Sequence, residues 1–200
     1  EYAAANMRRL QEQRQALFFR LQNNSASACA QLSACLTLAE QWAGVSQEPA
    51  AVPCMEEAVL SFLRSCEVLT SDWKQMLEQA ANAPEPENFL AYTPALDQEI
   101  RLFTMDMLYR YYLRAAYAET PEAEILPLQM AAFAVCVVLL YSRRLGFHTA
   151  EQRLRIWQLF VKEIEYDENN LEELEWQLET NAAFSPAAFR AYFASLGGVQ

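Results

Sequence analysis

The sequence predicts an all-α protein, a single-domain bundle of about seven or eight helices over residues 1–200. Only four of the 200 residues are glycine, so the tight turns of β-hairpins have little to build on. Runs in which polar and branched residues alternate are missing, which removes the usual signal for strands. Apolar residues make up 53% of the chain, enough for one sizeable core.

The chain opens with a predicted helical hairpin over residues 1–44. Apolar residues at helical spacing indicate one helix over about 2–22 and a second over about 28–42. The connection between them, Asn-Asn-Ser, is short enough to make the two helices antiparallel neighbours. Gly44 is suited to end the second helix.

Proline-containing stretches over 45–52 and 83–94 are the predicted linkers. The sequence between them is helical, with a candidate break at Thr70-Ser71-Asp72. A helical core follows over residues 94–200.

Three helices in this core begin with a hydroxyl residue followed by proline, at Thr93-Pro94, Thr120-Pro121 and Ser185-Pro186. The hydroxyl oxygen accepts a hydrogen bond from a free amide group of the first turn, and proline stands where no amide is needed. Thr149 and Gln152 have the spacing of a capping box, and the preceding Gly146 is suited to end a helix.

The helix from Pro94 to about Ala118 is apolar on most of its circumference, so other helices must surround it. Asp106, Arg110 and Arg114 form its polar strip at a spacing of four. Its tyrosines either pack in the core and interfaces or line a ligand pocket, because buried phenols need polar partners. The candidate pocket or interface residues are Tyr109, Tyr112, Tyr117, Arg110 and Arg114.

The apolar run from Ile125 to Tyr141 is interpreted as the central core helix. It contains Pro127 and Gln129 and is shorter than the ~20 residues of a bilayer span, so no membrane span is predicted. Arg143-Arg144 at its end suits the negative end of a helix dipole. The formal net charge of −11 argues against a nucleic-acid partner.

The cysteines are odd in number and lack metal-binding spacing, which is typical of free thiols in the cytoplasm. They are Cys29, Cys35, Cys54, Cys66 and Cys136. Cys136, among valines, is expected to be a buried apolar residue.

A helix over 149–166 precedes an acidic helix from Asp167 to Glu179, which has six acids and no base. This acidic helix is either a solvated face or a docking site for a basic partner or Ca²⁺. His148 is expected to be a turn residue rather than a general base, since no nucleophile motif adjoins it. Glu163 and Glu165 do not share a helix face. We therefore predict no catalytic, cofactor-binding or metal-binding residues in this chain.

Three stretches, in this order, resemble the C-terminal region of the flagellin lysine-N-methylase family. They are Met7-Arg8-Arg9-Leu10 through Ala16-Leu17-Phe18-Phe19-Arg20-Leu21-Gln22 to Leu36-Thr37-Leu38-Ala39, then Glu99 to Tyr112 with Met130 to Tyr141, and finally Ile156 to Glu165. Where the family has a histidine after the last stretch, this chain has Tyr166.

The resemblance implies a methyltransferase that acts on lysine side chains of flagellin. It also implies that a cysteine-rich segment with an iron–sulfur cluster, and binding of S-adenosylmethionine, belong to a longer parent protein. Because the chain begins with Glu1 rather than Met, we expect it to derive from a longer chain. This region alone would dock substrate or act as a scaffold rather than catalyse methyl transfer.

The residues themselves also fit a second hypothesis, a free-standing helical module that binds a ligand or a protein. The tyrosine-rich helix is its main support, since such a helix can line a ligand-binding core.

Overall fold

The computed structural model describes residues 2–23, 25–45, 54–84 and 92–196, with side chains from residue 5 onward. Within these ranges the chain forms helices and turns and has no strand. The α-helices are α1 (Tyr2–Gln22), α2 (Ala28–Ala43), α3 (Met55–Ser65), α4 (Ser71–Asn82), α5 (Pro94–Tyr111), α6 (Leu126–Leu145), α7 (Ala150–Phe160), α8 (Glu168–Thr180) and α9 (Pro186–Leu196). The shorter elements are the 3₁₀ helices η1 (Tyr112–Tyr117), η2 (Glu122–Ile125) and η4 (Ala182–Phe184), and the π-helix η3 (Val161–Glu165).

The hydroxyl caps confirm most of the predicted helix starts. Thr93 Oγ1 accepts a hydrogen bond from Leu96 N at 3.1 Å, and Ser185 Oγ accepts one from Ala188 N at 3.2 Å. Thr149 and Gln152 form the expected capping box. These bonds satisfy amide groups that have no partner inside the helix.

Glycine ends two of the helices as predicted. Gly44 after α2 has φ 69° and Gly146 after α6 has φ 65°. This left-handed conformation raises the free energy of residues that carry a Cβ, whereas glycine adopts it without a steric penalty.

The described residues contain nine α-helices rather than seven or eight, because the break near Thr70 separates α3 from α4. The Thr70 side chain caps α4 by accepting a hydrogen bond from Trp73 N. The Asn170 side chain holds the segment before the cap through two hydrogen bonds of 2.8 Å, accepting one from Glu67 N and donating one to Glu67 O. Distant side chains therefore stabilise the break. The predicted linkers 45–52 and 83–94 lie largely outside the described residues.

Two helices change their winding where the sequence predicts continuous α-helix. The tyrosine-rich helix leaves α geometry after Tyr111 and continues as η1, and the helix predicted to reach Tyr166 becomes π-helical after Phe160. A 3₁₀ helix has three residues per turn rather than 3.6, so side chains of η1 point in other directions than α spacing predicts.

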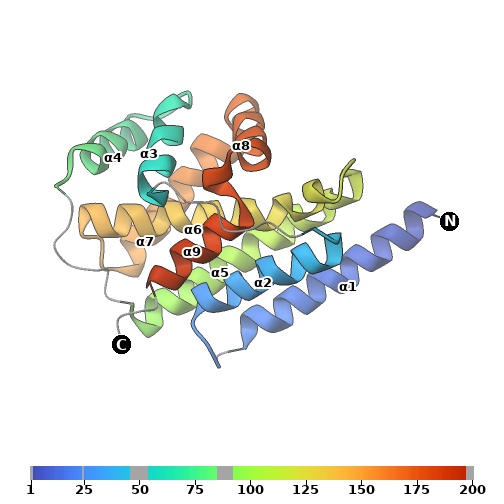
Figure 1. The fold of residues 1–200 in the computed structure, drawn as a ribbon. Coiled ribbons are helices and arrows are strands. Elements are labelled where there is room, and N and C mark those ends of the chain that lie inside the picture. Colours follow the sequence, from blue (N-terminus) through green and yellow to red (C-terminus); the bar gives the residue numbers. More distant parts are fainter. Residues whose placement is uncertain (1, 24, 46–53, 85–91, 197–200) are drawn as a thin grey trace.

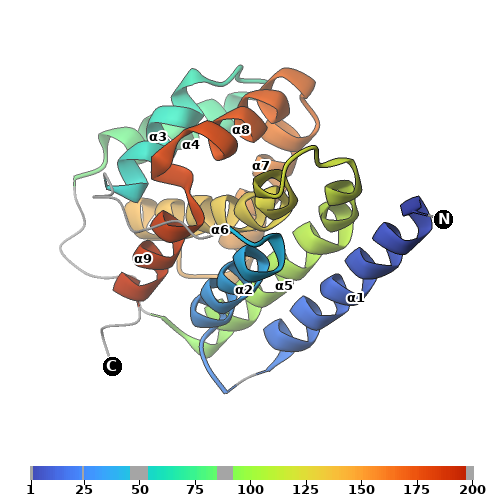
Figure 2. The same cartoon turned by 45° about the vertical axis from the view of Figure 1, so that its right-hand side comes forward.

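Helix α6 lies at the centre of the bundle, as predicted, with α1, α2 and α5 on one side and α3, α4 and α8 on the other (Figures 1 and 2). Its residues from Pro127 to Ser142 are buried. With η2 it forms a helical stretch of 24 residues, Glu122–Leu145, which is long and apolar enough to cross a membrane. The prediction that this segment is too short was therefore wrong. However, 83% of its apolar window is buried inside the bundle, as expected of a core helix.

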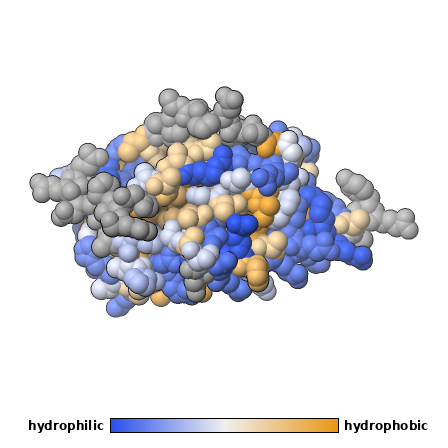
Figure 3. Space-filling view, turned by 60° about the horizontal axis from the view of Figure 1, so that its bottom comes forward, coloured by the Kyte–Doolittle hydropathy of each residue, from blue (hydrophilic) through white to orange (hydrophobic). Residues whose placement is uncertain are grey.

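Aromatic residues fill the space around α6. Phe133 meets Phe62 of α3 and Phe184 of η4 edge-on, each at a centroid distance of 5.2 Å. Cys136 is buried as expected. The outer face seen in Figure 3 is mostly hydrophilic, with a smaller apolar area near its middle.

Candidate ligand cavity at the start of the central helix

The three predicted tyrosines do not converge on one site. Tyr112 is buried, and its hydroxyl lies 3.3 Å from Gln13 Oε1 of α1. Tyr109 is 67% exposed and lies under the guanidinium of Arg14 at 5.6 Å, while Tyr117 is 85% exposed. The change to 3₁₀ winding after Tyr111 contributes to this divergence.

Arg110 has a structural role rather than a place in a pocket. It forms ion pairs with Asp106 at 2.8 Å and with Glu165, and its guanidinium lies 5.2 Å from the Tyr111 ring centre. The Tyr111 hydroxyl donates to Glu165 Oε2 at 2.7 Å. Burial raises the pKa of Tyr111 above its ordinary value, and the hydrogen bond to Glu165 raises it further. The Glu165 side chain is fully buried, so this pair fastens η3 to the end of α5.

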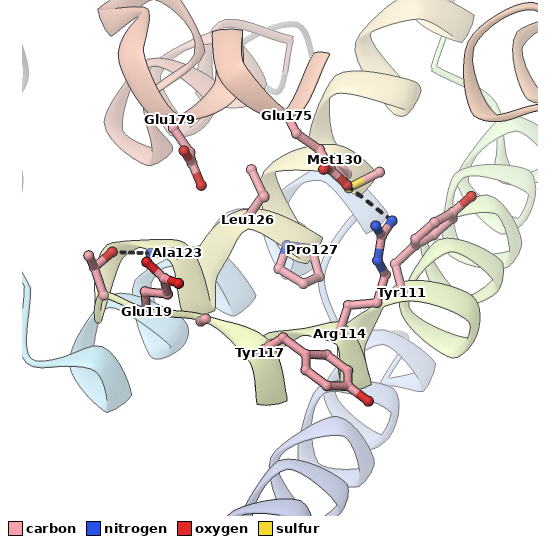
Figure 4. Close-up of a pocket in the computed structure, with 13 residues that line it drawn as sticks. Tyr111, Arg114, Tyr117, Glu119, Ala123, Leu126, Pro127, Met130, Glu175 and Glu179 are labelled. Carbon is pink, nitrogen blue, oxygen red and sulfur yellow. Dashed lines mark hydrogen bonds and ion pairs between the residues drawn. The ribbon is translucent and has the colours of Figure 1, made fainter. Parts of the chain in front are cut away.

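A cavity of about 690 Å³ lies between α8 on one side and η1 and η2 on the other, at the start of α6 (Figure 4). Of the five predicted residues, Arg114 and Tyr117 line it and Tyr109, Tyr112 and Arg110 do not. Figure 4 shows the Tyr117 ring directed away from the carboxylates of the cavity. Tyr117 therefore contributes to the rim rather than to the interior.

The wall of the cavity is largely apolar and comes from consecutive parts of the chain. It contains Ala115, Ala118, Ala123, Leu126, Pro127 and Met130. Met130 is buried, while Leu126 is partly exposed. The small alanines of η1 and η2 leave the space that larger side chains would fill.

Three carboxylates and one guanidinium supply the charge of the cavity: Glu119, Glu175, Glu179 and Arg114. Arg114 pairs with Glu175 at 3.0 Å and lies 5.6 Å from the Tyr111 ring centre. Within the described part of the chain, the exposed carboxylates of Glu119 and Glu179 form neither a hydrogen bond nor an ion pair with another side chain. One cation thus faces three anions, which favours a positively charged ligand.

Burial raises the pKa of Glu175 above its ordinary value. Arg114 lowers this pKa, whereas Glu179 and Glu172 raise it again. Because the pKa of Glu175 is raised, the attraction of Arg114 does not fully compensate for burial and for the neighbouring carboxylates.

The remaining predicted residues lie apart from the cavity. His148 is exposed in the turn before α7, where its backbone N–H donates to Gln152 Oε1 at 3.0 Å. Tyr166 is 81% exposed. Glu163 binds Leu69 N and Thr70 Oγ1, whereas Glu165 binds Arg110, which confirms that these two carboxylates face different partners.

The acidic helix α8 is only partly solvated. Asp167 caps it, Glu175 joins the cavity, and Glu168 and Glu172 are exposed. Among the described residues, no group of three or more His, Cys, Asp or Glu side chains is placed to hold a metal ion. The spacing of four between Glu175 and Glu179 was a signal for one shared face, but nothing local in the sequence indicated that Glu119 lies opposite them.

Burial also makes four of the cysteines poor nucleophiles. It raises the pKa of Cys29, Cys35 and Cys66 to about 12 and that of Cys136 well above the ordinary value. A thiol that stays protonated neither attacks nor ligates metal at neutral pH.

No protein-family model, no curated protein and no solved structure matches this chain.

Proposed function

We propose that this chain is a protein-docking region without a reaction of its own. The observation that carries the proposal is a set of large aromatic side chains left exposed on α5, η1, α8 and the turn before α8, which we call the aromatic surface. It consists of Tyr109, Tyr117, Tyr166 and Trp176, which are 67%, 85%, 81% and 56% exposed. Tyrosine and tryptophan are the residues that contribute most to protein interfaces.

Ion pairs connect the elements that carry the aromatic surface. Arg110 of α5 pairs with Glu165, the residue before Tyr166. Arg114 of η1 pairs with Glu175, the residue before Trp176. Tyr117 also borders the acidic cavity, so we expect a partner that contacts this surface to present basic side chains.

The resemblance of the segment order to flagellin lysine-N-methylases gives this partner a candidate identity, flagellin. In this proposal the chain docks flagellin for a longer bacterial methylase that acts in the cytoplasm. The resemblance implies an iron–sulfur cluster and S-adenosylmethionine, and the proposal assigns both to the longer parent protein.

The docking proposal is tested by titrating the chain with purified flagellin. We expect Tyr117→Ser and Trp176→Ser each to weaken binding about tenfold, the usual loss for an aromatic interface residue. Phe19→Ser is the matched control, since Phe19 is 78% exposed on α1, outside the aromatic surface. Equal effects of all three variants would rule out the aromatic surface as the docking site.

The assignment of flagellin as the substrate needs a separate experiment. Mass spectrometry of flagellin from a strain that lacks the coding region should show the loss of methylated lysines. Unchanged methylation would reject the flagellin assignment even if the aromatic surface binds another protein.

The cavity supports a second candidate function, a free-standing ligand-binding module. Its volume of about 690 Å³ lies in the range of small-molecule sites, roughly 300–1,000 Å³. A ligand that binds only the folded state raises the melting temperature. A panel of hydrophobic ligands that leaves the melting temperature unchanged would count against this alternative.

A further inference from the structure

The cavity at the start of α6 has the two polar ends and the apolar middle that a small dication requires. Figure 4 shows Glu175 at one end, beside Met130, and Glu119 and Glu179 toward the other end, on opposite sides of the space. Leu126 and Pro127 lie between these two ends. A chain of methylene groups can contact Leu126 and Pro127 while charged groups at its two ends approach the carboxylates.

The charges at the two ends differ in how they are satisfied. Glu175 is partly buried and has Arg114 as its counter-ion at 3.0 Å. Within the described residues, the carboxylates of Glu119 and Glu179 have no such partner. A positive group at their end therefore gains attraction without displacing any cation of the protein.

We infer that this cavity binds an alkane-diammonium ion, a diamine or polyamine with one ammonium group at Glu175 and another between Glu119 and Glu179. The site goes beyond the docking of a protein and does not depend on it. Anions are disfavoured, because three carboxylates surround the space. A ligand with one positive charge would leave one end unsatisfied.

Arg114 competes with the ligand for Glu175. Its side chain is 50% exposed, so breaking the ion pair returns the guanidinium to water at little cost. The face of Tyr111 lies 5.6 Å away and continues to attract the guanidinium after Glu175 is released. Loss of Arg114 should therefore strengthen ligand binding rather than weaken it.

Calorimetric titration of the whole chain with cadaverine and with n-pentylamine tests the two-ended site. The two probes have the same five-carbon chain and differ in the second ammonium group. We expect cadaverine to bind about tenfold more tightly, because a hydrogen bond between charged groups contributes roughly that factor. Equal affinities, or no heat of binding for either probe, would overturn the inference.

A third probe separates a free diamine from a lysine side chain, which presents the same ammonium chemistry on a peptide. Nα-acetyl-lysine amide carries one ammonium group, so it should bind as weakly as n-pentylamine. Binding as tight as that of cadaverine would reject the two-ended diammonium site and indicate a site for lysine-containing peptides.

Variants of the charged residues that line the cavity locate the site without changing the hydrophobic core. Glu175→Gln, and separately Glu119→Gln with Glu179→Gln, should each lower the affinity for cadaverine about tenfold. Arg114→Gln should raise it. Glu168→Gln is the matched control, because it removes one negative charge from an exposed position of α8 outside the cavity. A loss of affinity in Glu168→Gln equal to that in Glu175→Gln would show that only the overall charge attracts the amine.

Discussion

The two ends of α6 meet acidic side chains in opposite ways. At its C-terminal end, Arg143 and Arg144 project toward α3, where Arg143 pairs with Glu56 at 2.6 Å and Arg144 pairs with Glu57 at 2.6 Å. Arg144 also approaches Glu56 to 3.5 Å, so two cations balance two anions. We call this the closed end.

The N-terminal end of α6, which we call the open end, borders the cavity with the carboxylates of Glu119, Glu175 and Glu179. Among the residues that the structure describes, only Arg114 balances these carboxylates. At the closed end of α6, ion pairs balance the charges and join α6 to α3. At the open end, carboxylates outnumber guanidinium groups around the cavity. Matched and buried charges indicate a structural role, whereas unmatched charges around a cavity indicate a binding role.

The largest effect should come from removing the shared carboxylate of the closed end. The Glu56 side chain is 4% exposed and serves both Arg143 and Arg144. Glu56→Ala should lower the free energy of unfolding by about 3 kcal/mol, because the largely buried guanidinium of Arg143 then loses its ion-pair partner. Urea denaturation measures this loss.

Glu57→Ala is the matched control, since the Glu57 side chain is 64% exposed. Its pair with Arg144 should contribute less than about 1 kcal/mol. If both variants lost the same stability, the closed end would not depend on buried charge matching.

A smaller effect is expected at the glycine that ends α6. Gly146→Ala should lower the free energy of unfolding by about 1 kcal/mol, because its φ of 65° is costly for a residue with a side chain. An added Cβ would have His148 Nε2 at 3.7 Å as its nearest neighbour, which is ordinary contact.

Gly44→Ala at the end of α2 measures the cost of the left-handed backbone conformation by itself. Gly44 has φ 69° and no neighbour within 4 Å of an added Cβ. Thermal denaturation should give similar losses for the two variants. A much larger loss at Gly146 would show that the turn after the closed end is under tighter packing constraint than the backbone angle alone explains.

Sequence predicted those parts of the fold that local chemistry determines. The hydroxyl caps at Thr93, Thr149 and Ser185 and the left-handed Gly44 and Gly146 are local signals, and the structure confirms them. The centre of the bundle followed from the apolar run of α6. Such signals act within a few residues of the chain and need no knowledge of packing.

The candidate site depends on contacts between distant residues, and sequence predicted it only in part. Tyr112 and Tyr109 were candidates for the same pocket or interface as Arg114, but both contact α1 instead, through Gln13 and Arg14. Glu175 reaches Arg114 across 61 positions of sequence. No periodicity reports such a pair, because periodicity describes one element and not its neighbours.

At the open end, Glu175→Gln should change the free energy of unfolding by less than about 1 kcal/mol at neutral pH, in contrast to Glu56→Ala. Loss of the ion pair with Arg114 is opposed by relief of repulsion from Glu179. Urea denaturation of the two variants under one condition compares the two ends directly. A loss near 3 kcal/mol for Glu175→Gln would mean that the open end also holds the fold together.

The smallest effect is the pH dependence that Glu175 itself adds. Its pKa is raised in the folded state above the ordinary 4.5, first by burial, so the folded chain binds more protons than the unfolded chain in this range. Stability from this group is therefore fully present below about pH 4.5 and is lost as pH rises through the higher folded pKa. The unfolding free energy of the native chain minus that of Glu175→Gln should fall from pH 4 to pH 7. In an Arg114→Gln background the fall should be steeper, because Arg114 lowers the pKa of Glu175. If the unfolding free energy of the native chain minus that of Glu175→Gln rose with pH, the ion pair with Arg114 would affect the pKa of Glu175 more than burial does. The open end would then be charge-matched like the closed end.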